Sequence, residues 1–192
     1  AYKEKPDSSS DRSYLMKKPG FYLSEESYVS DIYEALKYEK GNRYPLTYVM
    51  EAADDISYCL ADIEDAVEKN ILSLEKLSEL LLKAYDVNGD VDEKSFKNGK
   101  ASFKGIVDGA LRKSEEEKIN KAHEYFIHLR VNFIHELVGH ASQRFVDNLE
   151  DIFIGRLNEA LLEDDSCFHY VVKTFKEVAS KNVFNHPEVQ TL

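Results

Sequence analysis

The sequence predicts an all-α protein of six or seven helices, and three observations support this prediction. Apolar residues recur every three or four positions through most of the chain, which is the period of an amphipathic helix. No stretch alternates polar and apolar residues between hairpin turn signals, as strands do. The periodic stretches are separated by residues that end or begin helices. The expected helices occupy, in chain order, residues 24–40, 45–69, 73–85, 103–112, 115–146, 149–162 and 167–180.

The first three helices have recognisable boundaries. In the first, Tyr28, Ile32 and Leu36 lie at helical spacing, and a Lys-Gly pair follows at residues 40–41. Pro45 suits the first turn of the second helix, because the amide hydrogen that it lacks has no partner there. Ser73 is a favourable N-cap for the third helix, since its hydroxyl can accept a hydrogen bond from a free backbone amide.

The later part of the chain is divided by two breaks. Residues 86–104 are rich in Asn, Gly, Asp, Ser and Lys, a composition that predicts a loop. Asp147 and Asn148 predict the end of the long helix that begins near Glu115. We expect residues 1–13 to be a flexible N-terminal segment and residues 14–192 to form one partial helical domain.

The composition limits the function. The chain has 192 residues, 43% of them hydrophobic, and a net charge of −11, which argues against a nucleic-acid coat or an anionic membrane as its main partner, although a local basic patch leaves nucleic acid open. There is no run of 18 apolar residues and no apolar core resembling a signal peptide near the start. Two cysteines, Cys59 and Cys167, cannot form a disulfide framework, and we expect both to be buried and inert.

Two motifs resemble metal sites but lack the required spacing. His135 and His140 are five residues apart, roughly 140° around a helix, whereas a zinc-protease helix needs a spacing of four. The acidic segment that begins at Asp86 has Val91 and Lys97 where a calcium loop needs glycine and glutamate. We interpret this segment as a solvated acidic loop.

One stretch of the second helix has the composition of a site. Asp54, Tyr58 and Asp62 are spaced four apart, so they lie on one helix face at intervals of about 6 Å along the axis. Burying two carboxylates without partners would be costly. The row is therefore either a ligand-binding face or an ordinary solvent-exposed acidic face, and both interpretations remain open from spacing alone.

Several blocks resemble one enzyme family. They are Tyr14 to Glu26, Glu51 to Cys59, Asp62 to Glu68, Leu129 to Asn132 and Ala141 to Leu149. In this order they resemble the deoxyguanosinetriphosphate triphosphohydrolase family, of the enterobacterial type, a branch of the HD-domain metal phosphohydrolases. The likeness extends from about Ser13 to the end of the chain and corresponds to a middle-to-C-terminal portion of such an enzyme.

The resemblance implies roles for four residues. Asp54 matches the last of the family's metal ligands, Tyr58 the tyrosine that packs against the deoxyribose, and Asp62 the aspartate that holds the 3′-hydroxyl. Lys18 matches a lysine that contacts the triphosphate, although Lys17 beside it could serve. The metal would be magnesium or manganese. The implied reaction is hydrolysis of dGTP to deoxyguanosine and intact tripolyphosphate.

The resemblance also implies what this chain lacks. None of its six histidines precedes Asp54, and it contains no His-Asp pair, whereas the family's metal histidines come earlier in the sequence. We therefore expect a fragment with no catalytic residue of its own, inactive alone and without bound metal. The parent enzyme would be a bacterial cytoplasmic homo-oligomer, typically a hexamer, with no membrane partner.

Two other functions remain open. The first is a non-catalytic helical interaction module whose acidic face contacts a basic partner. The second is a different HD nucleotide phosphohydrolase, such as a nucleotide monophosphatase. The sequence does not fix which base the triphosphohydrolase or the other HD phosphohydrolase would prefer.

Overall fold

The computed structural model describes residues 12–15, 21–39, 42–87, 96 and 101–185, and within them the all-α prediction is confirmed. These residues form seven α-helices and no strand. The helices are α1 (Glu26–Ala35), α2 (Pro45–Glu68), α3 (Leu74–Val87), α4 (Phe103–Glu116), α5 (Lys121–Asp147), α6 (Leu149–Phe153) and α7 (Cys167–Ala179). A 3₁₀ turn, Leu23–Glu25, precedes α1, and a π-helical turn, Ser180–Phe184, follows α7.

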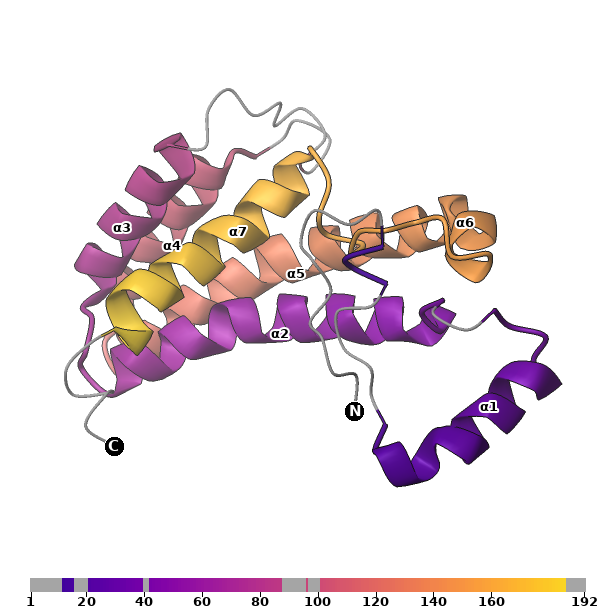
Figure 1. Cartoon of the computed structure of the whole chain (residues 1–192). Coiled ribbons are helices and arrows are strands. Elements are labelled where there is room, and N and C mark those ends of the chain that lie inside the picture. Colours follow the sequence, from indigo (N-terminus) through magenta and orange to yellow (C-terminus); the bar gives the residue numbers. More distant parts are fainter. Residues whose placement is uncertain (1–11, 16–20, 40–41, 88–95, 97–100, 186–192) are drawn as a thin grey trace.

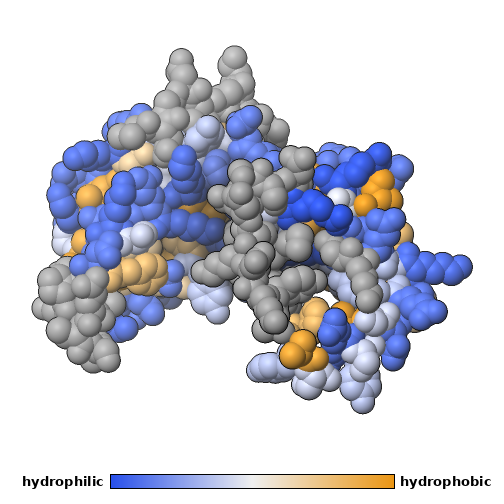
Figure 2. Space-filling model, in the orientation of Figure 1, coloured by the Kyte–Doolittle hydropathy of each residue, from blue (hydrophilic) through white to orange (hydrophobic). Residues whose placement is uncertain are grey.

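The two long helices α2 and α5 run through the molecule and carry the shorter ones (Figure 1). α7 packs on α2 and α3, while α4 packs between α3 and α5. α1 projects from the end opposite α3 and has no buried residue. Figure 2 shows a mostly hydrophilic surface on this face, with small separate hydrophobic areas.

An aromatic cluster fills the space between α4, α5 and α7. The rings of Phe103, Phe133 and Phe175 lie 5.4 to 6.0 Å from one another between centroids, and all three side chains are fully buried. Phe96 and Phe168 extend the cluster. Tilted and edge contacts of this kind stabilise a core beyond the area that they bury.

Side-chain caps fix where the helices begin. The Ser73 hydroxyl accepts a hydrogen bond from the amide of Lys76 at 3.2 Å, as predicted. Ser102, Asn120 and Ser166 cap α4, α5 and α7 in the same way. Pro45 stands in the first turn of α2, and beyond its C-cap Asn70 adopts a positive φ of 57° that turns the chain away.

The bounds predicted for the first, fourth and fifth helices were wrong. The first helix is shorter than residues 24–40, because Lys37 adopts a φ of 52° just after Leu36 caps α1. Glu115 and Glu116 belong to the last turn of α4 rather than to the start of α5, which begins after the cap residue Asn120. The predicted loop at 86–104 is bounded by α3 and α4, but residues 88–95 and 97–100 lie outside the described part of the chain.

The predicted helix over residues 149–162 is also wrong, because α6 ends at Phe153. Gly155 has a φ of 71°, a conformation that residues with a Cβ rarely adopt, and a Cβ there would lie 2.2 Å from Oδ1 of Asn42. The chain therefore leaves the helix at Gly155. It then runs irregularly to Ser166, where α7 begins.

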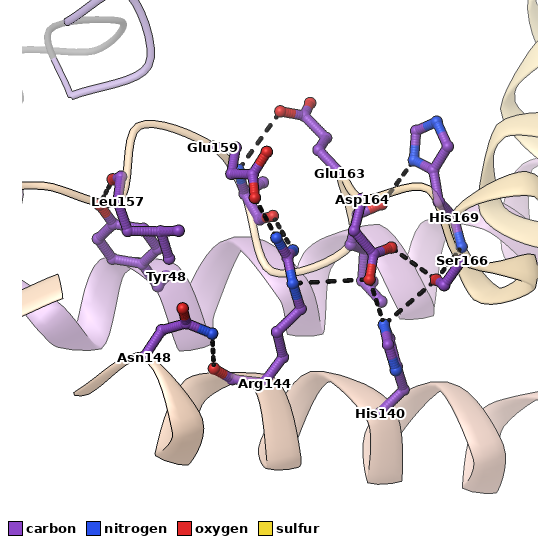
Figure 3. Close-up of polar contacts among 12 residues, drawn as sticks. Tyr48, His140, Arg144, Asn148, Leu157, Glu159, Glu163, Asp164, Ser166 and His169 are labelled. Atoms are coloured by element: carbon purple, nitrogen blue, oxygen red, sulfur yellow. Dashed lines mark hydrogen bonds and ion pairs between the residues drawn. The ribbon is translucent and has the colours of Figure 1, made fainter. Parts of the chain in front are cut away.

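A polar network fastens this irregular connection to α5 (Figure 3). Asp164 accepts hydrogen bonds from His140 at 2.8 Å and from Ser166 at 2.6 Å, and Arg144 lies 3.6 Å away. Arg144 also pairs with Glu159 and donates to the carbonyl of Ala160. Burial alone raises the pKa of Asp164, but these hydrogen bonds and charges lower it to about 2.

Candidate functional site

Four polar side chains form a row along the outer face of α2. Asp54 and Tyr58 are exposed, the tyrosine by 61%, and Asp62 is half-buried. Glu51, three residues before Asp54, heads the same row by helical spacing, about 4.5 Å further along the axis. The structure therefore keeps the predicted trio on one accessible face, and Glu51, whose side chain is only 14% exposed, continues the row at its buried end.

The opposite face of α2 explains why the row points outward. Ala52, Ile56, Leu60 and Ile63 are buried, and they recur every three or four residues. α5 and α7 cover this apolar face. The rotation of α2 about its axis is thus set by hydrophobic burial, which leaves the Asp54 side in contact with solvent.

The acidic residues of this stretch divide into paired and unpaired groups. Glu51 pairs with Arg43 at 2.7 Å, Asp55 pairs with Lys176 of α7 at 2.6 Å, and Glu64 pairs with Arg130 of α5. Asp55 therefore helps to join α2 to α7. Asp54 and Asp62 have no cationic partner within the described ranges. The two carboxylates that the resemblance assigns to ligands are therefore free to accept them.

The environment of Asp62 favours its neutral form more than water does. Partial burial raises the pKa of this carboxyl above its ordinary value, and the nearby charge of Asp65 raises it further. A hydroxyl that donates a hydrogen bond would stabilise the charged form of this partly buried carboxyl, because the bond replaces part of the solvation that burial removes.

The donor groups near Asp54 fit a metal ion only in part. The carboxylate of Asp54 is exposed and unpaired, as a ligand for a hard divalent cation should be. Across the part of the chain that the structure describes, however, no group of three or more His, Cys, Asp or Glu side chains could hold an ion. Asp54 thus fits as one ligand, and the described residues do not complete the set.

Lys18 lies outside the described residues, so its position relative to the row is not defined. Before it, Tyr14 and Leu15 are buried, and Tyr14 contacts Glu51 and Arg43. Sequence reasoning assigned no function to Arg43 or Glu51. The helical spacing of Glu51 from Asp54 was the signal that could have identified it.

Two other features lie away from the row. His140, Asp164 and Ser166 resemble a hydrolytic triad in composition, but one nitrogen, Nε2 of His140, faces both Asp164 and Ser166. A triad needs the histidine between the two groups, so this network is structural.

A surface pocket beside α7 is lined by Asp55, Lys173 and Lys176 among others, and it includes none of the three predicted residues of α2. Both cysteines are buried and neither forms a disulfide, and burial raises the pKa of the Cys59 thiol to about 12.

No helix among the described residues is both long and apolar enough to cross a membrane.

Comparison with known proteins identifies relatives over nearly the whole chain. A Pseudomonas aeruginosa protein named "Probable deoxyguanosinetriphosphate triphosphohydrolase" is 51% identical over 200 aligned positions, covering 100% of this chain and 39% of that protein. Proteins of Serratia proteamaculans and Yersinia enterocolitica named "Deoxyguanosinetriphosphate triphosphohydrolase" are each 47% identical over 188 positions, covering 97% of this chain and 35% of theirs. No family model matches the chain.

The chain thus spans between a third and two fifths of the length of these relatives. Sequence identity of 47% to 51% over nearly the whole chain confirms the resemblance that the sequence blocks indicated. This chain is homologous to part of the deoxyguanosinetriphosphate triphosphohydrolases.

Proposed function

We propose that the chain is part of a metal-dependent hydrolase that converts dGTP to deoxyguanosine and tripolyphosphate. The observation that carries the proposal is the row on α2. Within the part of the chain that the structure describes, no basic residue pairs with Asp54 or Asp62, while the nearby acids Glu51, Asp55 and Glu64 are each neutralised by one. The names of the homologues supply the reaction class.

The order of the row matches the order of groups in a deoxynucleoside triphosphate. Asp62 would accept a hydrogen bond from the 3′-hydroxyl, and the exposed ring of Tyr58 would pack against the deoxyribose. Such contact leaves no room for a 2′-hydroxyl, which selects deoxy sugars. Asp54, one turn nearer the N-terminus of α2, would then lie at the α-phosphate and supply one ligand to a divalent cation.

A metal ion held there would polarise the phosphoryl group and lower the pKa of a bound water. The chain's own contribution is to orient the nucleotide along α2 and to provide the Asp54 carboxylate. The remaining metal ligands and the catalytic histidine of the proposed enzyme would come from a longer protein, so the 192 residues alone would be inactive.

The identity of the metal, the oligomeric state and the compartment of the parent enzyme belong to the same proposal. Asp54 suits magnesium or manganese, since both prefer oxygen ligands. Homo-oligomerisation of the parent enzyme would cover exposed apolar side chains such as Val131 and Val138 on α5. Two cysteines that form no disulfide fit a reducing compartment, and the bacterial relatives fit a bacterial cytoplasm.

Product analysis of the complete reading frame that encodes this chain tests the proposal. The purified protein would be incubated with dGTP and Mg²⁺ or Mn²⁺, and the products separated by anion exchange. Deoxyguanosine and tripolyphosphate are expected in equal amounts from the wild-type protein. The Asp54→Ala variant should form neither, because it loses a metal ligand.

The matched control is Glu68→Ala, which removes another exposed acidic side chain of α2 and should keep full activity. Release of pyrophosphate or phosphate would assign a different HD phosphohydrolase reaction. Absence of any hydrolysis would favour the helical interaction module.

A further inference from the structure

A compact cluster closes the end of the row beyond Asp54. It consists of Tyr14, Arg43 and Glu51, and we call it the Tyr14–Arg43–Glu51 cluster. Nη2 of Arg43 lies 2.7 Å from Oε2 of Glu51, and the Tyr14 hydroxyl donates to the same oxygen at 2.7 Å. The guanidinium also lies 4.2 Å from the centre of the Tyr14 ring. One carboxylate oxygen thus receives both a cation and a hydroxyl.

The cluster is buried and fixed to the rest of the fold. The Arg43 and Glu51 side chains are only 11% and 14% exposed, and Tyr14 is 4% exposed. The amides of Tyr14 and Leu15 both donate to Oδ1 of Asn158, at 3.0 and 3.2 Å. Burial, followed by the hydrogen bond to Glu51, keeps the pKa of Tyr14 far above its usual value, so this hydroxyl stays a donor.

The position of the cluster gives it a defined place in the proposed reaction. If Asp62 and Tyr58 hold the sugar and Asp54 lies at the α-phosphate, the β- and γ-phosphates extend towards Glu51. A free carboxylate at that end would repel a highly charged triphosphate. Arg43 cancels this charge.

We propose that Tyr14, Arg43 and Glu51 are positioning residues that hold the end of the row ready for the distal phosphates of the substrate. The inference rests on the proposed function, and it adds a specific role for three residues to which the sequence resemblance assigns none. None of the three needs to touch the substrate. They act by fixing the Tyr14–Leu15 segment across α2 and by keeping Glu51 neutralised beside Asp54.

The test compares Tyr14→Phe with Tyr125→Phe in the full-length protein. Each variant loses one buried hydroxyl, but Tyr125 bonds Ser78 between α5 and α3, away from the row. Tyr14→Phe should raise the KM for dGTP about fivefold with kcat unchanged, because Glu51 and the Tyr14–Leu15 segment are held less firmly at the end of the row once their mutual hydrogen bond is lost. It should raise the inhibition constant of tripolyphosphate by the same factor and leave that of deoxyguanosine unchanged.

Arg43→Gln provides a second variant, since it leaves Glu51 as a carboxylate without its cationic partner at the end of the row. It should also raise the inhibition constant of tripolyphosphate and leave that of deoxyguanosine unchanged. Tyr125→Phe should lower the melting temperature without changing either inhibition constant.

A purely structural role for the cluster would lower the active fraction, so kcat would fall while KM and both inhibition constants stayed constant. That result would overturn the inference. Failure of the wild-type protein to release tripolyphosphate would instead overturn the proposed function itself, before any variant is compared.

Discussion

Replacing Asp164 by asparagine tests whether charge fastens the irregular connection before α7 to α5. The carboxylate faces His140, Arg144 and Ser166, and these groups lower its pKa from 3.8 to about 2 against the opposing effect of burial. One pKa unit corresponds to about 1.4 kcal/mol, so the ionised Asp164 contributes about 2 kcal/mol to the free energy of unfolding. Asp164→Asn removes this contribution at neutral pH.

The pH dependence follows from the direction of the shift. Because the folded-state pKa is depressed, the contribution is fully present above the unfolded-state pKa and is lost as the pH falls towards the folded value. Urea unfolding should show the variant less stable than wild type by about 2 kcal/mol at pH 7 and by about 1 kcal/mol near pH 3. Asp165→Asn, a neighbouring exposed acid, is the control and should change stability little. A difference that stayed constant between the two pH values would refute the electrostatic explanation.

Three further outcomes are expected. Gly155→Ala should lower the free energy of unfolding by about 3 kcal/mol, measured by urea titration, because the new Cβ meets both a positive φ and the Asn42 side chain; an unchanged midpoint would contradict this geometry. Ser102→Ala should cost about 1 kcal/mol in the same assay by removing the cap of α4. The KM for dGTP should rise as the pH is lowered through the raised pKa of Asp62, and Asp65→Asn should shift that rise to lower pH; identical profiles for both proteins would exclude Asp65 as a cause.

Helix periodicity and capping predicted most of the fold because those signals are local. The boundaries of α2 agree closely with the prediction, since Pro45 fixes its start and buried residues recur along its whole length. The failures have non-local causes. Residues 154–162 include the buried Ala160, Leu161 and Leu162, which resemble a helix in sequence. They nevertheless pack as an irregular segment, which Arg144 of α5 fastens through Glu159 and the carbonyl of Ala160.

The site was predictable to the extent that it lies on one helix. Spacing alone placed Asp54, Tyr58 and Asp62 on one face, and the structure shows that face exposed. Which of the acids are neutralised could not be predicted, because the partners Arg43, Lys176 and Arg130 are 8 to 121 residues away in sequence and are brought to α2 only by the fold. The role of Lys18 stays a prediction, as do the metal and the oligomer.

Comparing three nucleotides with the full-length protein tests most directly whether this row of α2 binds a deoxynucleoside triphosphate. The kcat/KM of dGTP should greatly exceed that of GTP, whose 2′-hydroxyl would meet Tyr58, and that of dideoxy-GTP, which lacks the 3′-hydroxyl for Asp62. The Tyr58→Ala variant should reduce the preference for dGTP over GTP and leave the preference over dideoxy-GTP unchanged. The Asp62→Ala variant should reduce the preference for dGTP over dideoxy-GTP and leave the preference over GTP unchanged. Equal kcat/KM values for all three nucleotides, or variants that change both ratios alike, would contradict the assignment of this row to the sugar.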